Sequence, residues 1–180
     1  GIILPTGAGA AIGAERALEQ ALEEAHLSRE DIDAIVTTGY GRTAISEGDK
    51  SITEITCHAR GGREIGSGDC AVIDVGGQDT KVILISQGMV QDFLMNDKCS
   101  AGTGKFLEIM ANRLGVSLSE LFGLADTGEV LPISSLCTVF AESEVINYIG
   151  EGRRREDIAA GVVDSVAAKV AQLALRKELP

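Results

Sequence analysis

The chain has 180 residues, a length that suits one domain with a sizeable core. Its net charge of −11 argues against nucleic acid or an anionic membrane surface as a partner, and without tryptophan there is little to stack on bases. No apolar run approaches the about 18 residues of a membrane span, and no basic-then-apolar leader starts the chain, so we expect a soluble, cytoplasmic protein. Its four cysteines fit reduced thiols or metal ligands better than a secreted disulfide framework.

The hydrophobic pattern along the chain predicts an α/β protein with a hairpin in its sheet. Helices are expected where apolar residues recur every three or four positions, and strands where short apolar runs end at turn residues. Gly88 supplies a tight hairpin turn, and the pair Gly61-Gly62 is expected to stop a helix. The predicted strands are 2–4, 32–38, 71–75, 81–86 and 89–94. The predicted helices are 14–25, 51–60, 101–114, 117–125, 138–149 and 155–177.

Two cysteines each precede a predicted helix. Cys99 stands before a small, glycine-bearing turn, and Cys137 stands before the helix that contains Glu142 and Glu144, which we expect in its first turn. A helix N-terminus favours an anion, either a thiolate or a negatively charged cluster that it holds. Two cysteines are half the ligand set of a cubane iron–sulfur cluster, and a twofold dimer would supply the other half. The separation of 38 residues matches no short metal motif, so a core or capping role is the alternative.

A second feature is the stretch 74–81, Asp-Val-Gly-Gly-Gln-Asp-Thr-Lys, which follows the predicted strand 71–75. The consecutive glycines Gly76 and Gly77 let backbone N–H groups approach a phosphate, and Asp74 can hold a metal ion or its water. Taken alone, these residues favour a plain β-turn. The stretch 102–105, Gly-Thr-Gly-Lys, is not a P-loop, because Phe106 stands where Ser or Thr would coordinate magnesium.

Four segments in order are more specific than any one of them: T-G-Y-G-R (38–42), D-V-G-G-Q-D-T-K (74–81), N-D-K-C-S-A-G-T-G-K-F (96–106) and S-S-L-C-T-V-F-A-E-S-E (134–144). Over nearly the whole chain they resemble the activator ATPases of 2-hydroxyacyl-CoA dehydratases. The ATP-hydrolysing subunits of benzoyl-CoA reductases belong to the same family, the BadF/BadG/BcrA/BcrD type. The resemblance implies an α/β, actin-like (ribonuclease H-like) ATPase fold, with residues 1–180 in a single ATPase domain.

The resemblance also implies a site and an activity. Cys99 and Cys137 match the ligands of one [4Fe-4S] cluster shared by a homodimer. Asp74, Gly76, Gly77 and Gln78 match the second phosphate loop, with Asp74 as the catalytic carboxylate and ATP with Mg²⁺ as the ligand. The implied activity is ATP-driven passage of a low-potential electron from ferredoxin or flavodoxin, through the cluster, to a CoA-ester dehydratase or reductase.

The chain departs from the family pattern at its ends. Neither the first phosphate loop, D-x-G-S, nor the glycine-rich adenosine loop is found, so we expect a partial copy of the fold. Two other functions stay open. One is a sugar or metabolite kinase of the same superfamily with structural cysteines, and the other is a non-catalytic assembly module. Cys57 and Cys70 are expected to be structural in every case.

Overall fold

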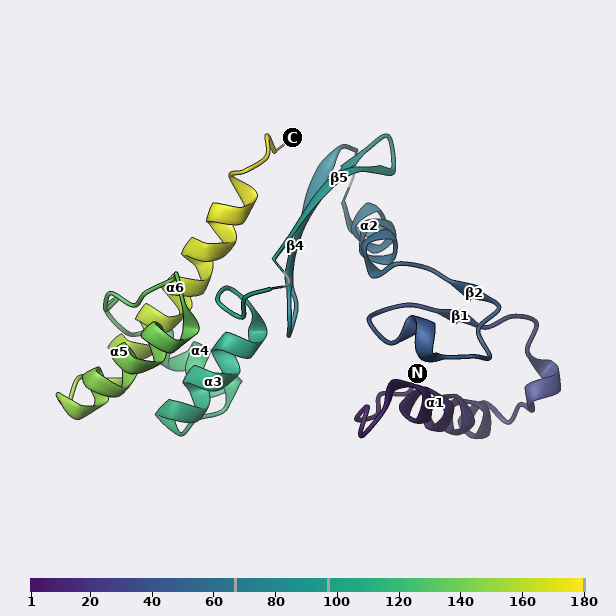
Figure 1. Cartoon of the computed structure of the whole chain (residues 1–180), viewed down its shortest axis with the longest axis horizontal. Helices are drawn as coiled ribbons and strands as arrows, with labels where there is room; N and C mark the ends of the chain where they lie inside the picture. The colour runs from purple at the N-terminus through teal and green to yellow at the C-terminus, as the bar shows by residue number, and fades with distance from the viewer. Residues whose placement is uncertain (67, 97, 180) are drawn as a thin grey trace. The chain divides into compact units, whose positions relative to one another are not determined.

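The computed structural model describes residues 1–66, 68–96 and 98–179 (Figure 1). Contacts divide the chain into two compact units, Gly1–Gly61 and Gly62–Pro180. The expectation of a single ATPase domain over residues 1–180 stays a prediction. None of the helices in the described ranges combines the length and the apolar character that crossing a bilayer demands.

The first unit contains a long helix and a minimal parallel sheet. Helix α1 (Ala10–Ala25) matches the predicted amphipathic helix and ends at His26, which adopts a left-handed conformation. Strand β1 (Val36–Thr37) pairs with β2 (Lys50–Ser51), and two short 3-10 helices, Arg29–Asp31 and Arg42–Ala44, flank β1. The predicted strand 32–38 is shortened to two residues because its partner strand is that short. The predicted strand 2–4 is wrong, since these residues belong to no strand of the structure.

Helix α2 (Glu54–Ile65) runs through the glycine pair that was expected to stop it. A Cβ atom at Gly62 would lie 2.4 Å from Cγ2 of Val72, whereas a Cβ atom at Gly61 would meet nothing within 4 Å. Gly62 therefore serves the close approach of a helix to a strand rather than the end of the helix.

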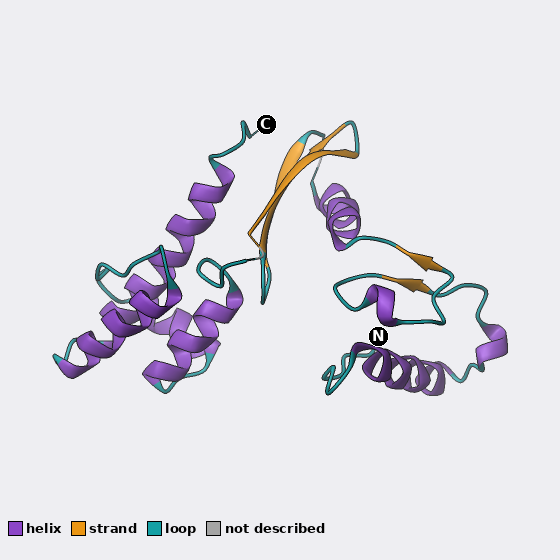
Figure 2. Cartoon of the chain, in the orientation of Figure 1, coloured by secondary structure: helices purple, strands orange, loops and turns teal. Residues whose placement is uncertain are grey.

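The sheet of the second unit is an antiparallel meander of β3 (Cys70–Val75), β4 (Thr80–Ser86) and β5 (Met89–Asn96), in that order. Figure 2 shows its strands in orange. All three strands were predicted, and the hairpin turn at Gly88 is confirmed. Gln87 and Gly88 have φ angles of 52° and 74°, the pair of positive values that a tight hairpin turn of this type requires.

The register assigns the strand residues to two faces. Ile73 lies opposite Val82, and Val82 lies opposite Leu94, so these apolar residues share one face. Helix α6 (Arg155–Ala174) covers this face through Leu173 and Ala174, which pack with Val82. Asp74 and its partner Lys81 therefore lie on the opposite face of the sheet.

The rest of the second unit is a group of helices, coloured teal to yellow in Figure 1: α3 (Gly104–Leu114), α4 (Leu118–Ala125), α5 (Thr138–Gly150) and α6. The predicted capping box at α4 is confirmed, with Ser117 and Glu120 bonding each other's backbone N–H groups. The helices share one core, whose fully buried members include Phe106, Met110, Leu121, Val145, Ile158 and Val162.

Helix α6 approaches the segment before α5 so closely that its position Gly161 excludes a side chain. Ala normally stabilises a helix interior by about 1 kcal/mol relative to Gly. A Cβ atom at Gly161 would lie 2.2 Å from the carbonyl oxygen of Leu131, whereas one at Gly123 in α4 would meet no atom within 4 Å. We expect Gly161→Ala to lower the free energy of unfolding by about 1–3 kcal/mol and Gly123→Ala to raise it by about 0.5–1 kcal/mol. Urea denaturation measures both, and a Gly161→Ala protein as stable as the wild type would contradict this packing.

Candidate functional site

A four-residue loop joins β3 to β4 and contains the predicted phosphate-binding residues Gly76, Gly77 and Gln78. Val75 and Thr80 form the last strand pair before the loop, and the N–H of Gly76 donates to the carbonyl of Asp79 at 2.9 Å. Gly77 and Gln78 are exposed. The predicted strands 71–75 and 81–86 thus placed this stretch correctly between two strands.

A buried lysine lies beside the loop and holds the predicted catalytic carboxylate. Lys81 is 3% exposed, its Nζ pairs with Asp79, which is also 3% exposed, and it lies 3.4 Å from Oδ2 of Asp74. Burial lowers the pKa of Lys81, but the hydrogen bond and charge of Asp79, together with those of Asp74, outweigh burial and raise the pKa above its ordinary value. The lysine is therefore charged at neutral pH. The Asp74 side chain keeps 26% of its surface exposed, enough to meet a metal ion or its water.

Two backbone hydrogen bonds fasten the loop to the start of α3. The N–H groups of Gly104 and Lys105 donate to the carbonyls of Gly76 and Gly77, both at 2.8 Å. In a trans peptide the N–H points opposite to the C=O, so the N–H groups of Gly77 and Gln78 point away from α3. Neither of these two N–H groups has a hydrogen-bond partner in the described part of the chain. Two successive backbone donors facing one way are a site for an anion such as phosphate.

Cys99 lies in the loop that leads into α3, not at the start of a helix. The predicted helix start at 101 is wrong, because Gly102 has a φ of 84° and Thr103 is extended, so α3 begins at Gly104. Asn96 fixes the loop by donating from Nδ2 to the carbonyl of Cys99 at 3.0 Å. The first N–H groups of α3 donate hydrogen bonds to the hairpin loop, so they are not donors to the thiolate of Cys99. Asp97, a member of the same motif, lies outside the described residues.

Cys137 is the N-cap residue of α5, as predicted. The segment before it is held by Glu144, whose carboxylate accepts the N–H of Ser134 at 2.6 Å. Glu142 pairs with Arg113 of α3. The expectation that both glutamates lie in the first turn of α5 is wrong, because the helix begins at Thr138.

The structure brings the two cysteine segments together. Ser100, next to Cys99, and Thr138, next to Cys137, form a hydroxyl–hydroxyl hydrogen bond of 2.8 Å. Both cysteines are half-buried free thiols. Among the described residues no group of three or more His, Cys, Asp or Glu side chains could hold a metal ion. Each chain thus places two half-buried cysteines in segments that contact each other.

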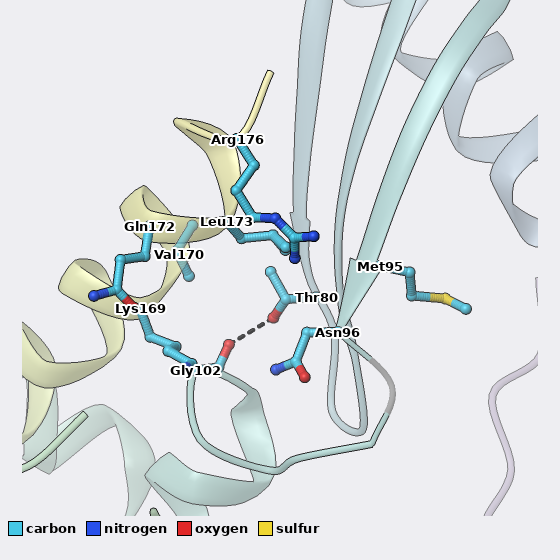
Figure 3. Close-up of a pocket in the computed structure, with 9 residues that line it drawn as sticks. All are labelled: Thr80, Met95, Asn96, Gly102, Lys169, Val170, Gln172, Leu173 and Arg176. Carbon is cyan, nitrogen blue, oxygen red and sulfur yellow. Dashed lines mark hydrogen bonds between the residues drawn. The ribbon is translucent and has the colours of Figure 1, made fainter. Parts of the chain in front are cut away.

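A cavity of about 450 Å³ joins the hairpin loop to the first cysteine segment, and it is lined by Gly77, Gln78, Ser100, Lys105 and Glu108. A second cavity, of about 380 Å³, lies between the ends of β4 and β5, the Cys99 loop and α6. Figure 3 shows Leu173 of α6 and Arg176, which follows this helix, reaching toward Thr80, whose hydroxyl donates to the carbonyl of Gly102 at 2.5 Å. Residues of the β3–β4 hairpin and of the loop that contains Cys99 therefore line both cavities together.

Three contributors to the site were missed from the sequence. The pairing of Lys81 with Asp74 follows from a four-residue hairpin loop, which places these two residues directly opposite each other. For Ser100 and Thr138 the sequence holds no signal beyond their position after a cysteine.

The buried lysine generates a stability test. Lys81→Met would leave Asp79 without the cation that neutralises it, and we expect the free energy of unfolding to fall by about 3 kcal/mol at pH 7. The raised pKa means that this contribution is complete below the ordinary lysine pKa and is lost as pH rises through the folded-state value. The difference between wild type and variant should therefore hold at neutral pH and shrink above about pH 10.4 in urea denaturation. The exposed control Lys105→Met should change stability by less than about 0.5 kcal/mol; an equal loss in both variants would contradict the role given to Lys81.

Comparison with known proteins identifies the family. The model of the BadF/BadG/BcrA/BcrD ATPase family matches residues 6–179. The chain is 48% identical over 166 residues to the 2-hydroxyisocaproyl-CoA dehydratase activator of Clostridioides difficile, which covers 91% of this chain and 62% of that relative. It therefore spans less than two thirds of that relative's length.

Solved structures agree with this assignment. The chain superposes on component A of (R)-2-hydroxyglutaryl-CoA dehydratase from Acidaminococcus fermentans with a TM-score of 0.89 and 44% identity, over 98% of this chain and 69% of the other. Against the Clostridium difficile activator with bound ADPNP the TM-score is 0.85 and the identity 46%, over 93% and 63% of the two chains. The chain belongs to the BadF/BadG/BcrA/BcrD ATPase family, and the fold class expected from the resemblance is confirmed as that of its activator ATPases.

Proposed function

We propose that this chain is part of an ATP-dependent activator that passes a low-potential electron to a 2-hydroxyacyl-CoA dehydratase or a benzoyl-CoA reductase-type enzyme. The observation that carries the proposal is the pair of hydrogen bonds from Gly104 and Lys105 to the hairpin loop. These bonds link a loop suited to phosphate with the segment that contains Cys99. An activator needs such a link, because the state of the nucleotide must alter the surroundings of the redox centre.

The hairpin loop is the proposed nucleotide-phosphate site. The outward N–H groups of Gly77 and Gln78 donate to phosphate oxygens, and the half-buried Asp74 holds Mg²⁺ or its water. Lys81 holds Asp74 in place from the buried side of the hairpin. The related activator solved with bound ADPNP supports a nucleotide as the ligand.

Cys99 and Cys137 are the proposed ligands of a [4Fe-4S] cluster shared by a homodimer. The fit rests on two thiols whose segments are hydrogen-bonded to each other and which are half-buried. Four thiolates complete such a cluster, so two chains related by a twofold axis satisfy it. When bound, the cluster accepts and releases one electron at a time. The chain's residues hold the thiolates, limit access of water and position the cluster for a partner.

The electron donor and acceptor complete the proposal. Ferredoxin or flavodoxin supplies the electron, and a CoA-ester dehydratase or reductase receives it, in keeping with the dehydratase activators that the chain resembles. The acyl-CoA substrate is bound by that partner enzyme and not by this chain.

The first test concerns nucleotide binding. A Cβ atom at Gly77 would meet no protein atom within 4 Å, so a side chain there leaves the folded protein intact and obstructs only a bound ligand. We expect Gly77→Val to weaken the binding of a non-hydrolysable ATP analogue about tenfold or more, measured by calorimetry, because the new side chain occupies the phosphate position. Gly123→Ala, remote from the loop and equally unobstructed, serves as the control. Wild-type and Gly77→Val proteins that bind the analogue with equal affinity would place the nucleotide elsewhere.

The second test concerns the cluster. Anaerobically reconstituted protein is expected to carry about four irons per dimer and to lose them in air. Cys99→Ser or Cys137→Ser should abolish iron binding, whereas Cys57→Ser, in the first unit, should retain it. Sedimentation without oxygen measures assembly in the same samples, and removal of the cluster should loosen the dimer by mass action. A protein that stays monomeric while it retains its iron would disprove a shared cluster.

A further inference from the structure

We propose that Ser100 and Thr138 are positioning residues, which hold Cys99 and Cys137 of one chain in a fixed relation through their hydroxyl–hydroxyl hydrogen bond. The proposal rests on the function proposed above, in which both cysteines bind one cluster. It assigns a role to two side chains that are not themselves among the proposed ligands.

The first argument is the location of the bond. Each hydroxyl belongs to the residue directly after a cysteine, and the 2.8 Å contact joins segments 38 residues apart in sequence. This hydrogen bond, one residue away from each thiol, ties the two cysteine segments directly to each other.

The second argument is that both backbones are already fixed, so the hydroxyls meet without further ordering. The carbonyl of Ser100 accepts hydrogen bonds from the N–H and the hydroxyl of Thr103, at 3.1 and 2.7 Å. Thr138 is the first residue of α5. A hydrogen bond between groups whose backbones are in place costs little additional conformational entropy.

The third argument is the rigid support behind the bond. Arg113 of α3 pairs with Glu142 of α5, and the buried residues Phe106 and Met110 share a core with Val145. These contacts fix the bodies of the two helices, while the Ser100–Thr138 bond fixes the ends that carry the cysteines. Because Gly104 and Lys105 are bound to the hairpin loop, a shift of that loop moves the Cys99 segment, and the hydroxyl bond makes the Cys137 segment follow.

The test uses paired variants with and without the hydroxyl. Ser100→Ala and Thr138→Val remove the bond with little change of shape, whereas Ser100→Thr and Thr138→Ser keep it. Ser143→Ala, on the exposed side of α5, is the matched control because its hydroxyl bonds to the carbonyl of Val139 in its own helix. The first readout is the rate at which iodoacetamide alkylates each cysteine in the cluster-free protein, resolved by mass spectrometry. The second readout is the midpoint potential of the anaerobically reconstituted protein.

In the Ser100→Ala and Thr138→Val proteins we expect iodoacetamide to alkylate both cysteines about fivefold faster than in the wild type. This is the factor by which the loss of one neutral hydrogen bond favours local opening of the two segments. The hydroxyl-retaining variants and Ser143→Ala should match the wild type. In loaded protein the iron content should persist while the potential shifts, since ligand position and solvent access tune it. Alkylation at wild-type rates in both Ser100→Ala and Thr138→Val would overturn the proposal. If the wild type binds no iron although both rates respond, the hydroxyl bond is supported and the proposed cluster is rejected.

Discussion

The contact between the hairpin loop and the start of α3 is the constraint on which the rest of the second unit depends. Thr103, the N-cap residue of α3, makes no side-chain capping bond, so the first N–H groups of the helix need other partners. The carbonyls of Gly76 and Gly77 provide them. A Cβ atom at Gly104 would lie 3.2 Å from the oxygen of Gly76 and from the Cα of Gly77, so glycine at this position permits the approach. The hairpin loop and the start of α3 are therefore held together by backbone hydrogen bonds.

The buried charges beneath the loop favour orientation more than stability. Removing Lys81, Asp79 and Asp74 from water costs several kcal/mol per ion, and their mutual attraction repays that cost only where geometry is good. One ammonium serving two carboxylates is well suited to fix both. The same arrangement leaves Asp74 partly exposed at the end of its strand, where a metal ion or water can reach it.

How much the sequence could predict depends on whether an element follows from local pattern or from contact. Short apolar runs and the turn residue Gly88 were sufficient for the meander, periodicity for α1 and α6, and a capping-box pattern supported α4. The local sequence predicts that the helix ends at Gly62, yet this glycine packs against Val72, a contact that no local pattern reveals. The start of α3 was misplaced because the positive φ of Gly102 forms part of a loop held by Asn96 and by Thr80 from another strand. The cysteine ligands and the phosphate loop stay predictions, and the bonds that join their segments are tertiary contacts that no local pattern reveals.

The hairpin loop is connected to the cysteines by backbone hydrogen bonds at one step and by a side-chain hydrogen bond at the next. The two steps therefore respond differently to substitution. Between the loop and α3 both donors and acceptors are backbone groups, so most side-chain changes leave that step intact. Between the cysteine segments the step is a single pair of hydroxyls, which one substitution removes. If nucleotide binding displaces the hairpin, the first step passes the displacement to Cys99 in any sequence that has glycine at 104. Passage to Cys137 depends on the helix contacts and on the hydroxyl pair. A ligand shifts a structure only as far as it binds one arrangement more tightly than another. Substitution at the hydroxyl pair changes how strongly the Cys137 segment follows the hairpin loop, so the coupling within one chain can be tuned there.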